Sequence, residues 1–330
     1  MDGLNCKVSI LIPVYGVEFY IERCAHSLFN QSYSNIEYVF VDDCTKDNSI
    51  TVLMQVLEKY PEHKKKVKIV RHNSNRGLAA ARNTAFDHST GEYIMHVDSD
   101  DFIELNTVEL LLEYAEEENA DIVICDNKCI YKDQIVMRKQ NIPFKKQEYL
   151  KSLLHRHIQP SIWGKLYSRK LYLKSNIRSI EGINFGEDYV FLPRIVYYAD
   201  VIVKLDRFLY NYVLYNNNAY TKNISLKTID DLYSADKILD DFFSSVPDHL
   251  SYVGIMIVSK LRTKLYLFKL SQIELWNNVK QLYSELSSYN YLLPISDRII
   301  MILVDYKCYR LLKCIISARK FLQMFRNRVL

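Results

Sequence analysis

The chain has 330 residues and a formal net charge of only +4, so charge alone gives no case for a general nucleic-acid binder. Hydrophobic residues make up 49% of the chain and charged residues 25%, which allows a sizeable core and argues against disorder. The seven cysteines form no CxxC pair and no secretory signal opens the sequence, so we expect reduced thiols in a cytoplasmic protein. The pairs Cys125 with Cys129 and His155 with His157 lack the further ligands of a metal site.

Short apolar runs alternate with helical stripes over the first half of the chain. The predicted strands cover residues 7–15, 36–41, 67–70, 93–97 and 121–125. The predicted helices between them cover residues 20–29, 50–60, 78–86 and 105–117. Strict alternation of this kind predicts an α/β domain with a mainly parallel sheet and right-handed crossovers. From about residue 225 onward the pattern is helical.

Three of the predicted strands end in residues suited to a ligand. In chain order these residues are Pro13, Val14 and Tyr15, then Asp42 and Asp43, then Asp98, Asp100 and Asp101. Ligands of such sheets bind outside the carboxyl ends of the strands, so all three ends should face one crevice. Hard oxygen ligands suit Mg²⁺ or Mn²⁺. The alternative for the last cluster is a solvated acidic turn that caps the helix near Leu105.

Phosphate-binding loops of the glycine-rich kind are missing from the sequence. There is no GxGxxG after the first strand and no GxxxxGKS, which excludes the dinucleotide fingerprint and the P-loop. The loop 15–18 has Gly16 as its single glycine. We therefore expect a metal and side chains, rather than a glycine nest, to hold phosphates.

A second acidic motif, Gly186-Glu187-Asp188, opens a helix-like run in the second half of the chain. Carboxylates in the first turn of a helix are favourable with the helix dipole, which is one interpretation of the pair. The other is a general base in a pocket.

Taken together, these motifs resemble the family 2 glycosyltransferases with a GT-A fold, from residue 7 to about residue 215. The motifs that carry the resemblance are Val8-Ser9-Ile10-Leu11-Ile12-Pro13-Val14-Tyr15, Asn30-Gln31-Ser32-Tyr33, Val41-Asp42-Asp43, Asn75-Arg76-Gly77-Leu78-Ala79-Ala80-Ala81-Arg82-Asn83, Asp98-Ser99-Asp100-Asp101, Trp163-Gly164-Lys165-Leu166-Tyr167 and Gly186-Glu187-Asp188. The resemblance implies a Rossmann-like catalytic domain at 1–220, in which 1–130 binds a nucleotide sugar and 131–220 forms the acceptor side. A helical region, 221–330, follows.

The resemblance also implies roles for donor-side residues. Pro13, Val14 and Tyr15 would line the nucleoside pocket with Glu18 nearby, and Asp43 would accept the uracil N–H. Asp98 would approach the ribose or the metal. Asp100 or Asp101 would ligate the divalent ion, Mn²⁺ or Mg²⁺, that bridges the diphosphate. Arg82 and Asn83 would flank the donor, and the alternative for Arg82 is a salt bridge within the domain.

On the acceptor side, the resemblance makes Asp188 the general base, with Glu187 beside it. One-step displacement by the acceptor oxygen would invert the anomeric centre. Trp163 would offer an apolar platform to a sugar ring, or it is a core tryptophan. Three positions depart from the usual family pattern of glycine, asparagine and glycine, and these are Cys44, Gly164 and Ala85.

The C-terminal segment 297–330 is basic, with eight Lys and Arg against two Asp, interleaved with apolar residues. Such a helix can lie on an anionic membrane surface, and the alternative is a helix packed on the catalytic domain. Its longest uncharged apolar run, Ile299 to Val304, is too short to span a bilayer.

The sequence therefore predicts an inverting, metal-assisted glycosyltransferase. Its donor would be a UDP-sugar, and its acceptor a glycan or lipid-linked hydroxyl in bacterial surface polysaccharide synthesis. It would be cytoplasmic, with peripheral contact to the inner face of the membrane and no nucleic-acid partner. The alternatives are a glycosyltransferase with a protein acceptor and a non-catalytic module that binds a nucleotide sugar or a glycan.

Overall fold

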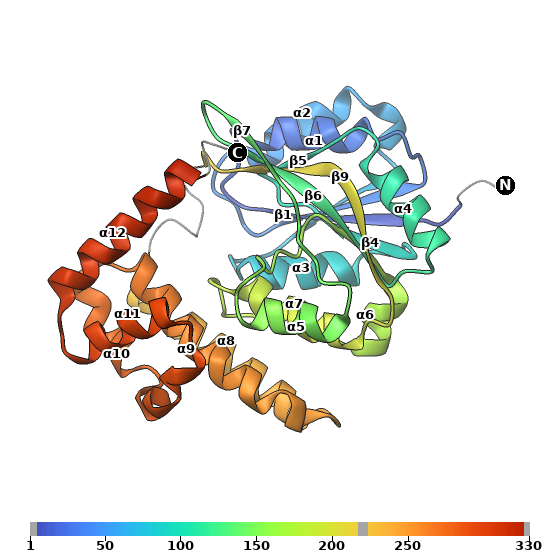
Figure 1. Ribbon diagram of the computed structural model, residues 1–330. Coiled ribbons are helices and arrows are strands. Elements are labelled where there is room, and N and C mark those ends of the chain that lie inside the picture. The colour runs from blue at the N-terminus through green and yellow to red at the C-terminus, as the bar shows by residue number, and fades with distance from the viewer. Residues whose placement is uncertain (1–4, 217–223, 327–330) are drawn as a thin grey trace. The chain divides into compact units, whose positions relative to one another are not determined.

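The structure is a computed structural model of the chain that describes residues 5–216 and 224–326 (Figure 1). The chain divides into two compact units. The first holds Met1–Leu153 with His157–Lys222, and the second holds Leu154–Arg156 with Asn223–Leu330.

A single sheet forms the centre of the first unit. Its strands are β1 (Val8–Val14), β2 (Ile36–Asp42), β3 (Val67–Arg71), β4 (Tyr93–His96), β5 (Phe102–Ile103), β6 (Ile122–Ile130), β7 (Ile135–Arg138), β8 (Lys165–Ser168) and β9 (Ile202–Val213). They run in the order β3-β2-β1-β4-β8-β6-β9-β5, and β7 pairs with β6. The four strands from β3 to β4 are parallel, as predicted. Strand β8 is antiparallel to both of its neighbours, so the sheet as a whole is mixed.

Helices cover both faces of this sheet (Figure 1). They are α1 (Ile21–Phe29), α2 (Ser49–Glu58), α3 (Leu78–Asp87), α4 (Thr107–Glu117), α5 (Lys146–Leu154), α6 (Arg169–Ser175) and α7 (Glu187–Tyr198). The elements predicted from residue 7 to residue 125 are confirmed. Strands β8 and β9 were not predicted, because β8 has only four residues and β9 carries charged residues on its exposed stretch.

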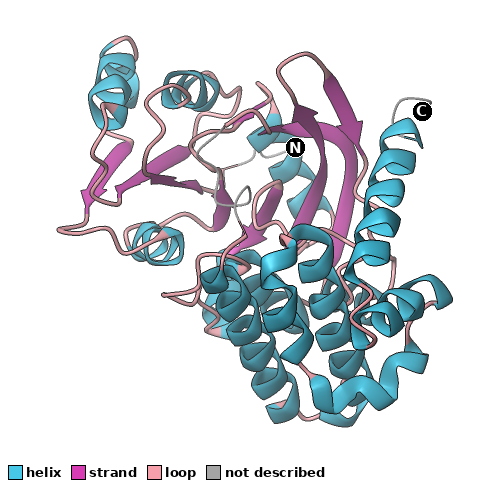
Figure 2. Ribbon diagram, turned by 90° about the vertical axis from the view of Figure 1, so that its left-hand side faces the viewer, coloured by secondary structure: helices cyan, strands magenta, loops and turns pink. Residues whose placement is uncertain are grey.

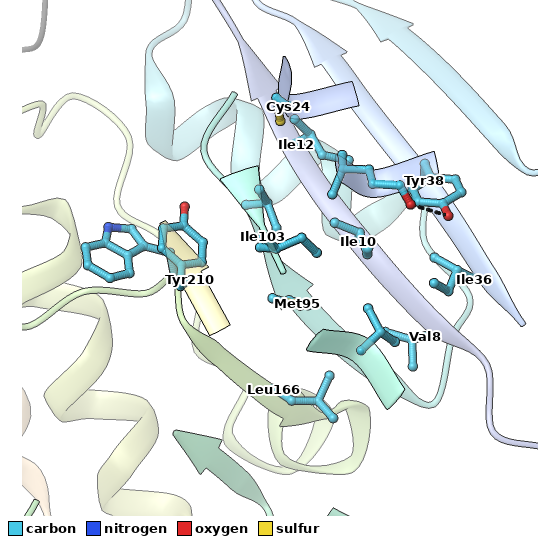
Figure 3. Close-up of a cluster of buried hydrophobic side chains, with 14 of the residues drawn as sticks. Val8, Ile10, Ile12, Cys24, Ile36, Tyr38, Met95, Ile103, Leu166 and Tyr210 are labelled. Carbon is cyan, nitrogen blue, oxygen red and sulfur yellow. Dashed lines mark hydrogen bonds between the residues drawn. The ribbon is translucent and has the colours of Figure 1, made fainter. Parts of the chain in front are cut away.

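The core explains why β1 and β2 are strands. Every residue of both is buried, which is typical of parallel strands covered by helices on two faces. Figure 3 shows Val8, Ile10 and Ile12 along one face of β1, packed with neighbours that include Met95. The buried hydroxyl of Tyr38 donates a hydrogen bond to the carbonyl oxygen of Leu28, 2.9 Å away, so this polar atom is satisfied.

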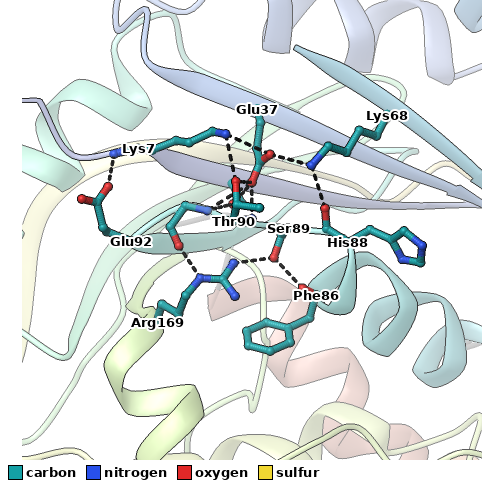
Figure 4. Close-up of polar contacts among 11 residues, drawn as sticks. Lys7, Glu37, Lys68, Phe86, His88, Ser89, Thr90, Glu92 and Arg169 are labelled. Carbon is teal, nitrogen blue, oxygen red and sulfur yellow. Dashed lines mark hydrogen bonds and ion pairs between the residues drawn. The ribbon is translucent and has the colours of Figure 1, made fainter. Parts of the chain in front are cut away.

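A polar cluster around Glu37 joins the amino-terminal ends of the strands (Figure 4). The buried carboxylate accepts hydrogen bonds from Ser9 Oγ at 2.6 Å, from Lys68 Nζ at 3.0 Å and from the backbone N–H of Thr90. Burial alone would raise the pKa of Glu37, but these donors outweigh it and bring the pKa to about 2. This cluster lies at the edge of the sheet opposite the acidic motifs, and it is structural.

The second unit is built from helices, as predicted for the C-terminal region (Figure 2). They are α8 (Leu226–Ser245), α9 (Val253–Leu270), α10 (Trp276–Gln281), the 3₁₀ segment η5 (Ser284–Leu292), α11 (Ile295–Asp305) and α12 (Tyr309–Arg326). Within residues 5–216 and 224–326, no helix has the length and apolar character needed to cross a membrane.

Candidate active site at the carboxyl edge of the sheet

The three strand ends singled out by the sequence meet at one edge. Strands β2, β1 and β4 are adjacent and parallel, with Val14 opposite Asp42 and Leu11 opposite His96. The residues that follow these strands therefore leave the sheet side by side. The predicted convergence of the three strand ends is confirmed.

The guanidinium of Arg82 is the centre of the site. Arg82 lies on α3 and its side chain is 2% exposed. Its Nη1 donates to Asp188 Oδ1 at 2.6 Å and to Glu187 Oε1 at 3.0 Å, and its Nη2 donates to Asp98 Oδ1 at 3.0 Å. The salt-bridge alternative for Arg82 is therefore the one that the structure shows, and it joins the turn after β4 to the first turn of α7.

Three carboxylates surround this one cation, and the pKa values of Arg82, Glu187 and Asp188 are shifted. Burial opposes the charge on Arg82, but Asp188, Asp98 and Glu187 outweigh it and raise the pKa of the guanidinium. Burial, then the charge of Asp188, raises the pKa of Glu187 to about 8. Burial also raises the pKa of Asp188, against the attraction of Arg82. The cluster carries excess negative charge, so near neutral pH it holds a shared proton or attracts a further cation.

Asp188 combines a fixed position with partial access. Gly186, at φ 93°, is the N-cap of α7 and places the carboxylate in the first turn of the helix. Asp188 Oδ2 accepts the backbone N–H of Ile162 at 3.2 Å, while the side chain remains 21% exposed. A positioned carboxylate with a raised pKa and an open side has the properties of a proton acceptor.

Two aspartates in the turn after β4, Asp100 and Asp101, differ in burial and in their hydrogen bonds. Asp101 is fully buried, and its two oxygens accept hydrogen bonds from Tyr210 Oη and the backbone N–H of Val213, each at 2.7 Å. Asp100 is less enclosed and accepts one bond of 2.7 Å from Asn216 Nδ2. Burial, then the charge of Asp98, raises the pKa of Asp100. Asp101 is thus a structural tie to β9.

These contacts decide which residues fit a divalent cation. In the part of the chain that the structure describes, no group of three or more His, Cys, Asp or Glu side chains is arranged as a metal site. Asp98 accepts a hydrogen bond from Arg82 through Oδ1, Asp100 accepts one from Asn216 through Oδ2, and both side chains are half-buried. A pair of carboxylate oxygens suits Mg²⁺ or Mn²⁺ when a bound diphosphate completes the shell. Of the predicted ligands, Asp100 fits better than Asp101, because Asp101 is fully buried and both of its oxygens accept hydrogen bonds from β9.

Asp43 is predicted to accept the uracil N–H, but in the structure its carboxylate interacts with groups of the protein itself. Its Oδ1 lies 2.8 Å from the backbone N of Arg76 and 2.6 Å from His72 Nδ1, and its Oδ2 lies 2.8 Å from the backbone N of Gly77. The buried carboxylate thus compensates the free N–H groups at the start of α3. Gly77 has φ 88°, a conformation that requires glycine, so this contact depends on both residues.

The other predicted donor-side residues differ in their openness. Pro13 and Val14 are buried in β1, whereas the Tyr15 side chain is exposed and open to a ligand. Glu18 Oε2 accepts both N–H groups of Asn48, backbone and side chain, at 3.1 Å.

The amide of Asn83 exchanges two hydrogen bonds with the backbone of Ser179, at 2.9 and 3.1 Å. Its contacts are therefore structural in this conformation. It joins α3 to the segment before α7, and so supports the Arg82 cluster.

Trp163 belongs to the core. Its side chain is 4% exposed and its ring stacks on Tyr210 at 4.6 Å and on Tyr212 at 4.9 Å between ring centroids. The expectation of an open sugar platform at this residue is wrong, because the neighbouring tyrosines of β9 cover the indole. The core alternative describes Trp163.

Two residues of the site were missed by the sequence reasoning. Tyr210 donates to Asp101 and accepts the backbone N–H of Asp98 at 3.2 Å, so it fixes the acidic turn. Lys165 is a buried ammonium that donates to the carbonyl oxygen of Ser161 at 2.6 Å, and burial lowers its pKa to about 8. A lysine inside the otherwise apolar motif after Trp163 was the available signal. Nothing in the pattern of β9 distinguished Tyr210.

Comparison with known proteins places this site in a family. The protein-family model described as "Glycosyl transferase family 2" matches residues 9–180 of this chain. The uncharacterized glycosyltransferase EpsJ of Bacillus subtilis strain 168 is 34% identical over 215 residues, which are 62% of this chain and 60% of EpsJ. The cholesterol galactosyltransferase of Borreliella burgdorferi is 28% identical over 282 residues, covering 77% of this chain and 76% of that protein.

A solved structure shows the same fold. The structure of Staphylococcus aureus TarS, residues 1–349, in complex with UDP-GlcNAc superposes with a TM-score of 0.72 at 19% identity, over 95% of this chain and 91% of TarS. This likeness confirms the predicted GT-A fold. Because the family match spans more than half of the chain, the protein belongs to glycosyl transferase family 2.

Proposed function

We propose that the protein transfers a sugar from a nucleotide-sugar donor, with a UDP-sugar as the expected donor, to a hydroxyl of a glycan or lipid-linked acceptor. The observation that carries the proposal is the Arg82 cluster. It holds Asp188 and Asp98 on one guanidinium at the carboxyl edge of the sheet. A binding module would need the donor side, but it would have no use for a positioned proton acceptor such as Asp188. The UDP-GlcNAc complex of TarS supports the choice of a UDP-sugar.

The proposed reaction is a single displacement. The acceptor oxygen attacks the anomeric carbon of the sugar while its proton passes to a carboxylate oxygen of Asp188. The bond between the anomeric carbon and the diphosphate oxygen breaks, and its electron pair leaves with the nucleoside diphosphate. Attack from the face opposite the leaving group inverts the configuration. In this scheme Arg82 keeps Asp188 ionised and aimed, and Glu187 shares the negative charge.

Asp100 and Asp98 are the residues that would hold a divalent cation on the donor side. When bound, such an ion neutralises charge on the diphosphate leaving group. A mannosyltransferase from Pyrobaculum calidifontis, with a TM-score of 0.54 to this chain, was solved with GDP-Man and Mn²⁺, which supports metal assistance. Burial and neighbouring carboxylates raise the pKa values of Asp100 and Glu187, so a cation nearby would stabilise their ionised forms.

A membrane-facing acceptor is supported by α11. Four apolar residues at spacings of four, three and four form one exposed stripe, which we call the α11 stripe: Ile295, Ile299, Ile302 and Tyr306, from 45% exposed at Ile299 to 79% at Tyr306. Exposed basic residues follow at Lys307, Arg310 and Lys313. An apolar stripe beside positive charge suits the surface of an anionic membrane. We therefore propose peripheral contact with the inner membrane face and a role in bacterial surface polysaccharide synthesis; a protein acceptor is the alternative.

The direct test is a screen of nucleotide sugars for release of the nucleoside diphosphate. The protein, with Mn²⁺, is expected to release UDP from at least one UDP-sugar and to bind UDP in calorimetry. GDP-sugars should give no release. Binding of UDP without any release, across sugars and candidate acceptors, would favour the binding-module alternative.

A further inference from the structure

The helical unit contains a pocket that the reaction at the strand ends does not use. Residues of α8, α10 and η5 enclose about 360 Å³, within the range of about 300–1,000 Å³ that is usual for small-molecule sites. All of its lining residues belong to the second unit. The residues that matter here are Asp230, Tyr233, Asn278, Gln281, Tyr283 and Glu285.

Tyr283 forms a fixed wall of this pocket. It is a buried aromatic residue with φ 52°, in the left-handed region that bulky residues rarely adopt. Its hydroxyl donates a hydrogen bond of 2.9 Å to Oδ2 of Asp236, which is fully buried on α8. Backbone strain of this kind persists only where the surroundings hold it, and it is concentrated at ligand sites.

Tyr233 supplies an open aromatic surface next to this wall. Its ring stacks on Tyr283 with centroids 5.7 Å apart and an angle of 28° between the planes. Tyr233 is nevertheless 47% exposed, so part of the ring faces solvent. The two tyrosines therefore form a preorganised aromatic corner, of which Tyr283 is the buried half and Tyr233 the open half.

The polar lining restricts what can bind. Asn278 and Gln281 offer amides that both donate and accept, and Asp230 and Glu285 offer carboxylates that accept. None of the nine described lining residues is Lys, Arg or His. A phosphate-bearing ligand, such as a nucleotide or a lipid headgroup, would meet two carboxylates and no cation among the lining residues. A neutral molecule with many hydroxyl groups and one apolar face fits all of these features.

We propose that this pocket binds a neutral pyranose ring of a glycan acceptor. The C–H face of the sugar would stack on Tyr233, its hydroxyl groups would donate to Asp230 and Glu285, and the amides would bond to the remaining oxygens. The inference rests on the proposed function, because a glycan is a substrate only if the protein transfers sugars. It adds a carbohydrate subsite built from residues of the helical unit.

The test uses the full chain and three neutral disaccharides as probes: N,N′-diacetylchitobiose, lactose and maltose. Binding is measured by saturation-transfer NMR and by titration, with and without saturating UDP. At least one probe should bind, and UDP should not displace it. The variant Tyr233→Ala should weaken that binding by up to about tenfold, which is the scale of a lost aromatic contact. The matched control is Tyr291→Ala, which removes an exposed tyrosine of the same unit outside the lining.

A second variant, at the lining residue Asp230, tests the same pocket without changing Tyr233 or Tyr283. Asp230 is exposed, so Asp230→Ala should leave folding intact and still weaken the bound probe. The proposal is overturned if no probe binds at about 10 mM, a level that detects even millimolar affinity. Equal affinity of Tyr233→Ala and Tyr291→Ala, or displacement of the saccharide by UDP, would also overturn it.

UDP binding, measured on the same samples, separates the two proposals. UDP binding without saccharide binding leaves the proposed function standing and rejects the subsite. Saccharide binding without UDP binding or UDP release rejects the proposed function and keeps a glycan-binding pocket.

Discussion

Arg82 and Asp188 lie 106 positions apart in the sequence, yet Nη1 of one is 2.6 Å from Oδ1 of the other. This is the shortest contact in the cluster, and the same guanidinium also holds Asp98. Asp188, the proposed proton acceptor, and Asp98, a carboxylate on the side proposed to bind the sugar donor, are therefore linked through one buried cation. A change in the charge of either carboxylate therefore changes the electrostatic environment of the other.

Replacing Arg82 with methionine should destabilise the protein strongly. The variant leaves three buried or half-buried carboxylates without their cation, and loss of one partner of a buried ion pair costs about 3–5 kcal/mol. Urea denaturation measures the free energy of unfolding. The matched control is Arg76→Met, which breaks an exposed pair with Glu181 and should cost no more than about 1 kcal/mol. Equal losses in the two variants would refute the central place of Arg82.

Substitutions of Asp100 and Asp101 should have different effects, one on UDP binding and the other on stability. Asp100→Asn should weaken Mn²⁺-dependent UDP binding with little effect on stability, because Asp100 is only half-buried and its side-chain partner is the amide of Asn216. Asp101→Asn should instead lower stability by about 1–3 kcal/mol, because an amide N–H₂ would face a donor. Calorimetry with UDP and Mn²⁺, together with thermal unfolding, checks both. An Asp101 variant with normal stability and lost UDP binding would reverse the assignment.

Acid stability should depend on Glu37. Its pKa is about 2 in the folded protein against 4.5 as the ordinary value, so its stabilisation is full above about pH 4.5. That stabilisation is lost as the pH falls from about 4.5 to about 2, and it amounts to about 3 kcal/mol. Glu37→Gln should be less stable at neutral pH and should show a flatter curve in this window. The control is Glu62→Gln, at an exposed position. A Glu37→Gln curve that parallels the wild type from pH 5 to pH 2 would be inconsistent with this role.

The α11 stripe should govern membrane contact. Ile299→Asp puts a charge in the stripe and should reduce flotation with vesicles that contain anionic phosphatidylglycerol by about tenfold, the scale of one lost apolar side chain. High salt should reduce binding of the wild type as well. Leu250→Asp, at an exposed leucine outside the stripe, is the control. Unchanged flotation of Ile299→Asp would reject the stripe as the contact surface.

Much of the catalytic unit could be predicted because local patterns decide it. The buried runs of β1 and β2, followed by Tyr15 and Asp43, fixed both the strands and the edge at which they end. The side chains at that edge could not be assigned in the same way. The choice between a diphosphate contact and a salt bridge for Arg82 depends on Asp188, which approaches only through the fold.

The surroundings of two predicted site residues could not be predicted from the sequence, for a related physical reason. Trp163 is covered by Tyr210, and Asp101 is bonded to the same tyrosine, so one residue of β9 decides both. Strand β9 has no continuous apolar run, and its pairing with β6 is a long-range event. A sequence motif shows which residue types are present, but not which of them are buried in the core.

The most direct test of the account is Asp188→Asn, with UDP binding and UDP release measured on the same preparation. The account predicts UDP affinity within about threefold of the wild type, because the donor side is retained, and UDP release from the UDP-sugar slower by at least about 10², the scale of a lost general base. Glu187→Gln, the neighbouring carboxylate on the same guanidinium, should be affected far less. Near-normal UDP release by Asp188→Asn would contradict the account.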